Sequence, residues 1–379
     1  MSQAAIATIQ EHFSVVQEPR VEYLIEYNLS EMIVIAVCAV ICGANDWVAI
    51  ADWGEAKKEW LKQYLKLENG IASHDCFRRL FLRLNPEQFQ QGFLSWVQAV
   101  FQLSQGQVIA IDGKEMHGTR SKTLGRRAID VVSAWATKNR LVLGQRKVDE
   151  KSNEITAIPE LLRLLDLEGC IVTIDAMGCQ TKIAEQIVEQ GGDYLLAVKA
   201  NQGHLHEDIA FLFDCAHRTE FKGIDSDYTK TVSQGHGRIE TRECWIIDDH
   251  EQLDFIRDRQ NWSNLQTIAM IRSERQEAGK TTTQEHYFVS SLLGDARQIL
   301  DAKRSHWGIE NELHWTLDVA FREDDHQLGL GNGPANFAVL RHIAASLLKQ
   351  ERTARCGIAN KRLKAAWNVD YLLKVLRAS

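Results

Sequence analysis

The sequence predicts an α/β protein in which helices flank a mixed sheet. Three observations carry this prediction: helical periodicity in residues 1–100, alternating strand-like and helical runs in residues 101–202, and strand-like runs between polar turns in residues 203–292. A long helical segment then fills residues 293–345, and a basic helical tail fills residues 346–379. We therefore expect a helical N-terminal domain, a core in two parts separated by a β-rich insertion, and a C-terminal tail.

The first hundred residues contain two well-marked helical patterns. Residues 32–44 are almost entirely apolar but too few to cross a bilayer, so they predict a buried helix. Residues 73–86 predict another helix, because apolar side chains recur there at helical spacing. The opposite face of that helix carries Arg78, Arg79 and Arg83. This face either contacts DNA or is simply solvated, and a solvated basic face is the commoner case.

The central region has the element order of a mixed sheet. From residue 108 onward, the pattern predicts strands and helices in the order β-β-β-α-β-α-β. The strand-like runs VIAI, IVTI and LLAV are followed directly by Asp112, Asp175 and Lys199. Because the carboxyl ends of parallel strands meet at one edge of a sheet, we expect a functional site along that edge.

Composition and charge describe a folded protein with local basic surfaces. A chain of 379 residues is long enough for two or three packing units. Its eight cysteines form no C-x-x-C pair and no signal peptide pattern opens the chain, so we expect reduced thiols in a cytoplasmic protein. The net charge is −7, yet the residues from Arg341 onward carry nine Lys or Arg against two acids, and another basic stretch includes Arg126 and Arg127. Such stretches can bind a polyanion despite the negative total.

Three carboxylates stand out as candidates for chemistry. Asp112 and Asp175 each follow a short, mostly apolar run, where an Asp is either a turn or capping residue or a metal ligand. Two such residues in one α/β unit favour the metal ligand. Glu310 lies in a helical pattern with His314 and Asp318 at intervals of four, beside the apolar stripe of that helix. The alternative is a solvated acidic face.

A set of three converging carboxylates suits Mg²⁺, with Mn²⁺ as a substitute. Hard cations prefer oxygen ligands, and Mg²⁺ takes a few carboxylates while retaining waters and phosphate oxygens. Two such ions about 3.5–4 Å apart can activate the attacking oxygen and stabilise the leaving oxygen of a phosphodiester. The residue types therefore point to phosphoryl transfer on a nucleic acid.

Several long motifs resemble the DDE transposases of bacterial insertion sequences, in the subfamily that includes the H-repeat-associated proteins of Rhs elements. The motifs are VIAIDGK, TIDAMGCQTKIAEQIVEQGGDYLLAVKANQG, HGRIETR, HYFVSSL and HWGIENELHWTLDVAFREDD, with CAVICGANDW and GIASHDCFRRLFLRL nearer the amino terminus. They occur in the family's order and span almost the whole chain.

The resemblance implies a ribonuclease-H-like core with acids at Asp112, Asp175 and Glu310. The wider group carries the pattern Y-x2-R-x3-E-x6-K around the last acid, whereas this chain has Lys303, His306 and Leu317 at the three flanking positions. Four other acids compete with Glu310 for the third role, and these are Glu312, Asp318, Glu323 and Asp324.

A further group of polar residues is expected to bind DNA or to support the acids. Lys199 and Asn201 either hold the scissile phosphate or are solvated, and His314 either positions a phosphate or is a hydrogen-bonded imidazole at the core edge. The other members of this group are Lys114, Arg126, Arg127, His306, Asn311 and Asp318. A zinc site at His306, Glu310 and His314 lacks the H-E-x-x-H spacing.

The function that the resemblance implies is transposition. We expect cleavage at the ends of an element, joining of the freed 3′-hydroxyl to target DNA, double-stranded DNA as the partner, and a homodimer or larger assembly on that DNA. The alternatives are a metal-dependent nuclease without strand transfer and a domesticated, non-catalytic DNA-binding protein.

Overall fold

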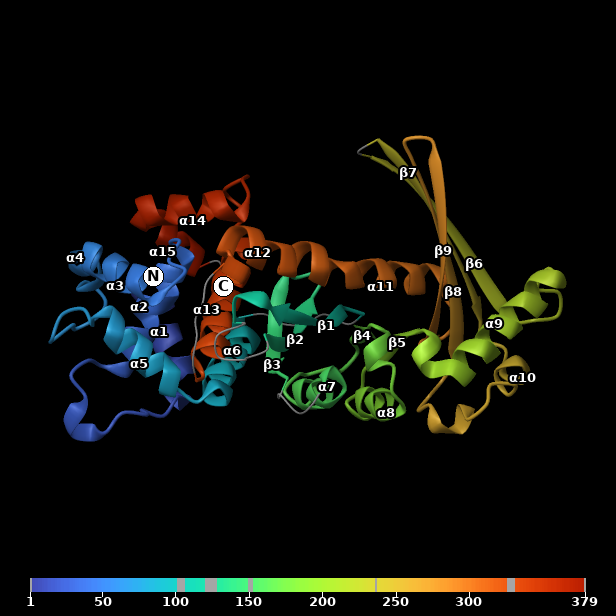
Figure 1. Cartoon of the computed structure of the whole chain (residues 1–379), viewed down its shortest axis with the longest axis horizontal. Coiled ribbons are helices and arrows are strands. Elements are labelled where there is room, and N and C mark those ends of the chain that lie inside the picture. Colours follow the sequence, from blue (N-terminus) through green and yellow to red (C-terminus); the bar gives the residue numbers. More distant parts are fainter. Residues whose placement is uncertain are drawn as a thin grey trace. The chain divides into compact units, whose positions relative to one another are not determined.

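The computed structural model describes residues 2–100, 106–119, 128–148, 153–235, 237–325 and 331–377. The chain folds into two compact units (Figure 1). The helical unit comprises residues 1–102, 113–151 and 310–379, and the sheet unit comprises residues 103–112 and 152–309. Because each unit combines several of the stretches distinguished in the sequence, the five-part division of the chain stays a prediction.

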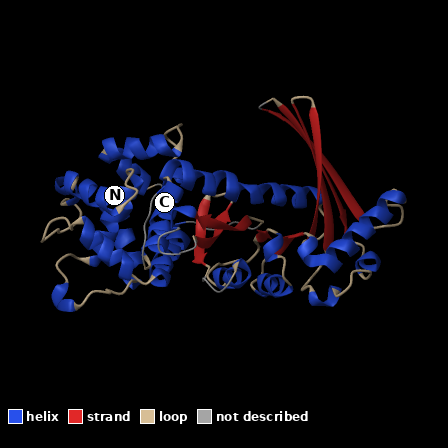
Figure 2. Ribbon diagram, viewed as in Figure 1, coloured by secondary structure: helices blue, strands red, loops and turns tan. Residues whose placement is uncertain are grey.

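The helical unit consists mainly of helices (Figure 2). The helices are α1 (Ser2–His12), η1 (Phe13–Val15), η2 (Glu22–Leu24), α2 (Leu29–Ile41), α3 (Trp47–Ala56), α4 (Lys58–Leu61), α5 (His74–Arg83), α6 (Pro86–Val100), η3 (His117–Thr119), α12 (Trp315–Phe321), η8 (Glu323–Asp325), α13 (Gly333–Gln350), α14 (Ile358–Trp367) and α15 (Val369–Leu376). The hairpin of β2 (Ile129–Ala136) and β3 (Leu141–Lys147) completes the unit.

The predicted helices of the N-terminal region are confirmed. Helix α2 begins after Asn28, whose side chain accepts a hydrogen bond from Glu31 N at 3.1 Å, and it is buried from Met32 to Ile41. Helix α5 begins after Ser73 and buries its apolar face, while Arg79 stays exposed. None of the described helices is long and apolar enough to span a membrane.

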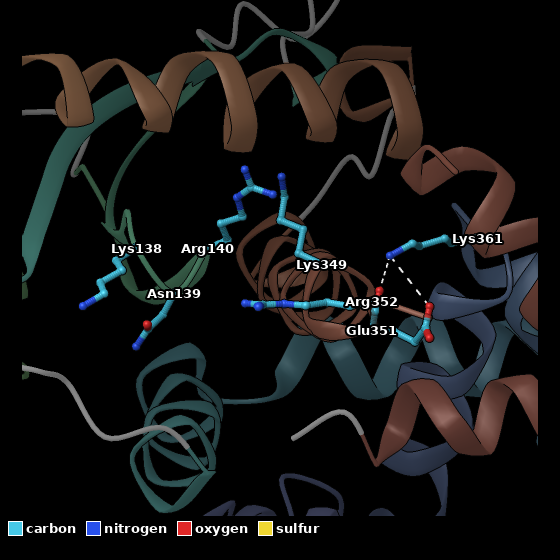
Figure 3. Close-up of a pocket in the computed structure, with 7 residues that line it drawn as sticks. All are labelled: Lys138, Asn139, Arg140, Lys349, Glu351, Arg352 and Lys361. Atoms are coloured by element: carbon cyan, nitrogen blue, oxygen red, sulfur yellow. Dashed lines mark hydrogen bonds and ion pairs between the residues drawn. The ribbon is translucent and has the colours of Figure 1, made fainter. Parts of the chain in front are cut away.

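The basic C-terminal stretch is not a solvated tail, and the expectation that its charges form a surface is wrong for Arg341, Lys361 and Arg362. All three are buried. Arg362 donates to Val40 O at 2.9 Å. Lys361 donates to Leu348 O at 2.9 Å and also to Glu351 O, and Figure 3 shows its contact with Glu351. These cations thereby satisfy the last carbonyl groups of α2 and α13.

The sheet unit is built on a mixed sheet. Its elements are β1 (Val108–Met116, shared with the helical unit), α7 (Glu154–Leu162), β4 (Ile171–Ile174), η4 (Ala176–Gly178), α8 (Thr181–Glu189), β5 (Asp193–Val198), η5 (Ala200–Gln202), α9 (Gly203–Arg218), β6 (Ser226–Gly235), β7 (Arg238–Ile247), α10 (His250–Leu253), η6 (Arg259–Asn261), β8 (Thr267–Glu277), β9 (Lys280–Ser290) and α11 (Ala296–Gly308). The strand order is β3-β2-β1-β4-β5-β9-β8-β7-β6.

The predicted order β-β-β-α-β-α-β is confirmed by β1 to β5 with α7 and α8. Strands β1, β4 and β5 are parallel, and β9, β8, β7 and β6 continue the sheet as an antiparallel ribbon. Helix α11 packs Ile299 and Leu300 against one face of the sheet, and α7 and α8 lie on the other face (Figure 1). The sequence prediction did not include helix α9 or strand β6. The residues of β6 are mostly polar, whereas α9 is amphipathic and buries Leu205, Ile209 and Leu212.

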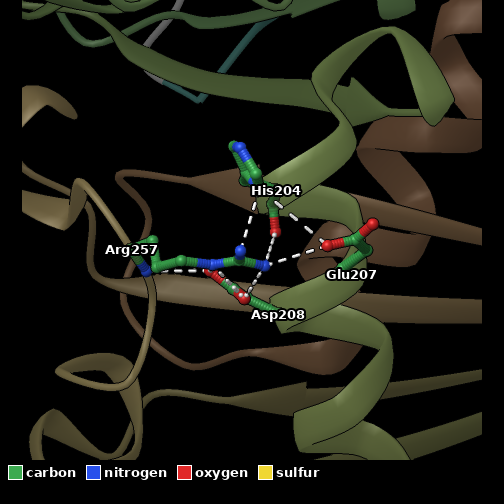
Figure 4. A network of polar contacts seen from close by, with 4 residues as sticks. All are labelled: His204, Glu207, Asp208 and Arg257. Carbon is green, nitrogen blue, oxygen red and sulfur yellow. Dashed lines mark hydrogen bonds and ion pairs between the residues drawn. The ribbon is translucent and has the colours of Figure 1, made fainter.

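An arginine network fixes helix α9 to the segment after α10 (Figure 4). Arg257 donates to Asp208 from both Nε and Nη2, and its Nη2 also reaches Glu207 Oε2 at 3.0 Å. The same guanidinium contacts His204 Nδ1 at 2.8 Å. The planar guanidinium suits this multiple contact, which orders an otherwise irregular connection.

A buried ion network ties β1 to the C-terminal helices of the helical unit. Glu323, with a side chain only 3% exposed, accepts from Lys114 Nζ at 2.9 Å and from Arg341 Nη1 at 3.2 Å. Lys114 is also paired with Asp318. Burial alone would raise the pKa of Glu323, but the charges of Arg341 and Lys114 outweigh it and lower that pKa. Glu323 is thus an ionised carboxylate between two buried cations.

We predict that Glu323→Gln lowers the free energy of unfolding by about 3–5 kcal/mol, because it leaves two buried cations without their shared counter-charge. Chemical denaturation of the full chain measures this loss. The matched control is Asp325→Asn, two residues away, which removes an exposed ion pair with Arg322 and should cost less than about 1 kcal/mol. Equal effects of the two variants would contradict the role given to Glu323.

Candidate functional site

Asp112 and Asp175 lie on neighbouring parallel strands of the sheet unit. Strands β1 and β4 are paired up to Ile111 and Ile174; Asp112 is the next residue of β1, and Asp175 directly follows β4. Both side chains are partly buried. The expectation that the first strand ends at Asp112 is wrong, because β1 continues to Met116. Asp112 is instead the first residue of β1 beyond its pairing with β4.

The turn after β4 holds Asp175 in a defined position. The Asp175 side chain caps the following 3₁₀ turn, with Oδ1 accepting from Met177 N at 3.0 Å. A Cβ at Gly178 would lie 2.3 Å from Ile174 Cγ2, so only glycine lets the turn fold back under the strand. Asn201 braces the same turn by donating to Ala176 O at 2.7 Å. One oxygen of Asp175 is therefore a capping group.

His306 is a partly buried, neutral imidazole beside Asp175. Its Nδ1 is 3.0 Å from Thr173 Oγ1, two residues before Asp175 on β4. Burial lowers the pKa of His306 to about 4, although the charge of Asp175 acts in the opposite direction. His306 occupies the position where the wider family pattern has an arginine. It supplies a hydrogen bond there and carries no charge at neutral pH.

Two lysines provide the positive charge of this region. Lys199 is exposed just after β5, and β5 is paired with β9 up to Val198 and Tyr287. Burial lowers the pKa of His286 on β9, and the charges of Lys303 and Lys199 lower it further. Lys303 lies on α11 with its Nζ 4.7 Å from the centre of the Trp307 ring. Lys199 and Lys303 thus both lower the pKa of the same histidine, so both charges lie near strand β9.

Glu310 lies where the long C-terminal helix changes its winding. Residues Ile309–His314 form a π-helical segment between α11 and α12, a feature that often occurs at functional sites. The extra residue per turn rotates Asp318 away from the face expected for a regular helix, and Asp318 is paired with Lys114. Glu310 itself is exposed.

The four competing acids are engaged within the helical unit. Glu323 and Asp318 bind Lys114, Glu312 Oε2 is 3.0 Å from Arg140 Nε, and Asp324 accepts from His117 N at 3.1 Å. Of the five acids, Glu310 is the one for which the described part of the chain provides no hydrogen bond or ion pair. Its carboxylate is thereby available to a ligand.

The remaining predicted residues differ in their surroundings. Asn311 is exposed in the π-helical segment, and His314 is partly buried there. Lys114 is mostly buried in its ion pairs. Arg126 and Arg127 lie outside the described residues.

Within the sheet unit, carboxylates supply only part of the ligand set that a hard cation needs. Among the described residues, no group of three or more His, Cys, Asp or Glu side chains is arranged to hold a metal ion. Asp112 and Asp175 nevertheless bring two carboxylates to adjacent strand positions, and oxygen donors are those that Mg²⁺ prefers. A third carboxylate is needed to complete such a set.

Sequence reasoning missed three contributors to this region. Thr173 orients His306, His286 borders the two lysines, and Gly178 permits the turn after Asp175. Thr173 and His286 belong to strands far from their partners in sequence, so no local pattern could mark them. The glycine was visible in the motif, but its close approach to Ile174 depends on the packing.

Comparison with known proteins finds two family models that match this chain. The family model described as "Transposase DDE domain" matches residues 103–347, and the model described as "DDE_Tnp_1-associated" matches residues 10–97. Among solved structures, the piggyBac transposase synaptic complex with hairpin DNA is similar at a TM-score of 0.44 and 11% identity, covering 99% of this chain and 82% of that chain.

Two curated relatives cover nearly the whole chain. The "H repeat-associated putative transposase YhhI" of Escherichia coli (strain K12) is 40% identical over 98% of both chains. The "Putative transposase YncI" of Escherichia coli O157:H7 is 38% identical over 98% of this chain and 95% of its own. The chain therefore belongs to the DDE transposase family, with the associated domain of that family preceding the DDE domain.

Proposed function

We propose that this chain is a Mg²⁺-dependent DNA transposase that cleaves at element ends and joins the 3′-hydroxyl to target DNA. The proposal includes a ribonuclease-H-like arrangement of the core, double-stranded DNA as substrate, and a homodimer or larger assembly on it. The observation that carries the proposal is the placement of Asp112 and Asp175 on adjacent parallel strands, at the point where the pairing of β1 with β4 ends.

The proposed metal ligands are Asp112, Asp175 and Glu310. DDE transposases generally use a divalent metal. Mg²⁺, or Mn²⁺ in its place, would supply activation of the attacking oxygen and stabilisation of the leaving oxygen. The protein contributes rigidity: the cap to Met177 N restrains Asp175, and β1 restrains Asp112. The exposed Glu310 supports the assignment of the third ligand, because its four competitors already have partners.

Other residues of the chain would bind or orient the DNA. Lys199 and Lys303 offer positive charge next to β5 and β9, as expected for contacts to backbone phosphates. Arg126, Arg127, Asn311 and His314 stay predicted DNA contacts. In this proposal Asn201 and Lys114 support the fold around the site and do not contact DNA, because the side chain of each is hydrogen-bonded to protein groups.

His306 is a positioning residue in this proposal. Its neutral imidazole holds Thr173 Oγ1 and thereby orients the end of β4, where Asp175 follows. A charged arginine at this place would compete with a metal ion for the carboxylate, whereas a neutral ring leaves the negative charge of Asp175 available. The unusual residue at this position is thus compatible with catalysis.

We predict that Asp112→Asn and Asp175→Asn each lower metal-dependent cleavage of end DNA about a thousandfold, equivalent to about 4 kcal/mol of transition-state stabilisation. The control is Asp214→Asn, which removes an exposed carboxylate paired with Arg218 on α9 and should leave the rate unchanged. Strand transfer of pre-cleaved ends is measured in parallel. Cleavage without any strand transfer would reduce the function to that of a nuclease.

The third acid is tested by two neighbouring substitutions. We predict that Glu310→Gln matches the loss seen for the two aspartates, because it removes a metal ligand. Glu312→Gln removes a carboxylate that is paired with Arg140, and it should retain most of the activity. If Glu312→Gln is inactive and Glu310→Gln is active, the assignment of the third ligand is wrong.

The pH dependence of stability tests the neutral state of His306. The folded pKa of about 4 lies below the ordinary 6.5, so the unfolded chain binds the proton more tightly, and the stabilisation present above about pH 6.5 is lost as the pH falls toward 4. From about pH 7 to about pH 5, His306 should account for roughly 2 kcal/mol of lost unfolding free energy.

His306→Asn provides the comparison, because asparagine can keep the bond to Thr173 without titrating in this range. Chemical denaturation at both pH values should show a smaller loss in the variant, and other histidines cancel in the difference. His306→Ala should lower the cleavage rate about 10- to 100-fold, with partial recovery in His306→Asn. An unchanged pH dependence in both variants would rule out a depressed pKa for His306.

A further inference from the structure

A basic pocket lies in the helical unit at the turn between β2 and β3 (Figure 3). It has a volume of about 460 Å³ and is bordered by that turn, by the carboxyl end of α13 and by α14. Five cationic side chains line it, namely Lys138, Arg140, Lys349, Arg352 and Lys361. The single acid among its lining residues is Glu351. None of these residues has a role in the proposed acid site.

Glu351 does not neutralise the cavity, because its carboxylate is used inside the protein. It accepts from Thr353 N at 2.8 Å, from Tyr371 Oη at 2.7 Å and from Ala354 N at 3.2 Å. Burial alone would raise the pKa of Glu351, but the hydrogen bonds from Thr353 and Tyr371 lower it to about 2. Lys361 Nζ, 3.8 Å from Glu351 Oε2, is directed at the same internal cluster.

The other cations remain in excess around the cavity. Arg140 uses its Nε for Glu312, and Lys349 donates to the carbonyl of Glu312 at 2.8 Å. Burial lowers the pKa of Lys349 to about 8, and repulsion from Arg140 contributes although Glu312 opposes it. Lys138 and Arg352 make no hydrogen bond or ion pair with the residues that the structure describes. A bound anion would relieve this accumulation of like charge.

The turn that carries three of the lining residues is held in place. Gln350, at the end of α13, donates its side-chain amide to Asn139 O, which fastens the turn to the helix. Arg140 has a φ of 55°, a left-handed conformation that a non-glycine residue adopts only when its surroundings enforce it. The pocket is therefore a preformed concave site rather than a chance gathering of surface lysines.

We infer that this pocket binds a backbone phosphate of DNA. The inference rests on the proposed DNA substrate and adds a contact in the helical unit that is separate from the acids. The lining contains no aromatic or apolar side chain on which a base could stack, so the contact is to the phosphate and independent of base sequence. The partial negative charge at the carboxyl end of α13 opposes an anion, but Lys361 offsets it by donating to Leu348 O at 2.9 Å.

The test is binding of an arbitrary fluorescent DNA duplex to the full chain, without divalent metal, in an Asp112→Asn background that prevents cleavage. The pocket variant is Lys138→Gln with Arg352→Gln, both exposed residues. We expect the slope of log affinity against log salt to fall by about 1.8 between about 50 and 200 mM salt, because two phosphate contacts are lost at about 0.9 each. The affinity near 0.1 M salt should fall about tenfold or more.

Two further variants serve as controls for this measurement. Arg163→Gln, just after α7, with Lys182→Gln on α8 makes the same net charge change and should leave slope and affinity close to the parent values. Lys138→Arg with Arg352→Lys preserves the charges and should restore binding. If the control variant with Arg163→Gln and Lys182→Gln lost as much DNA affinity as the pocket variant, the pocket would not be a specific site. Any two exposed positive charges would then contribute equally to DNA binding.

The outcomes separate this inference from the function on which it rests. If the parent binds DNA and the pocket variant keeps the parent slope, the pocket inference fails and the transposase proposal stands. If the parent fails to bind any duplex, the DNA substrate itself is refuted. If inorganic phosphate binds to the parent but not to the pocket variant, while both bind DNA with equal affinity, the pocket serves a free anion and the inference is overturned.

Discussion

The placement of strand β1 is the constraint on which the rest of the site depends, because both units share this strand. Up to Ile111 it is paired with β4, and beyond Asp112 its Lys114 is bound to Asp318 and Glu323. A shift of one residue would turn every side chain of β1 to the opposite face and would break both restraints together. The ladder fixes residues 108–111 within the sheet unit, and the ion pairs fix Lys114 within the helical unit.

The charged residues of the helical unit show why a cluster of charges in the sequence does not by itself predict a binding surface. Arg341, Lys361 and Arg362 belong to the most basic stretch of the chain, yet each is buried and bonded to a carboxylate or to helix-terminal carbonyl groups. Burying a cation is costly unless it is paired, so such residues are committed to stability. The charge left for a polyanion belongs instead to exposed residues such as Lys138 and Arg352.

The surroundings of Asp175 and Glu310 show how the state of a side chain depends on its neighbours. His306 is neutral because burial outweighs the attraction of Asp175, so it orients a strand end without competing for the carboxylate. The π-helical segment changes which side chains share a face, and it engages Asp318 with Lys114 while Glu310 stays exposed. Both effects arise from packing over long sequence separations, as between His306 and Thr173.

The sequence by itself determined the helices α2 and α5, the order of strands and helices from β1 to β5, and the family, because apolar periodicity, capping residues and ordered motifs are local properties. It also placed Asp112 and Asp175 next to buried strands. Only the tertiary structure decided that these strands are neighbours, that β1 continues past Asp112, and that the basic C-terminal residues are buried. Strand pairing and burial are set by contacts between distant segments, and no local pattern records them.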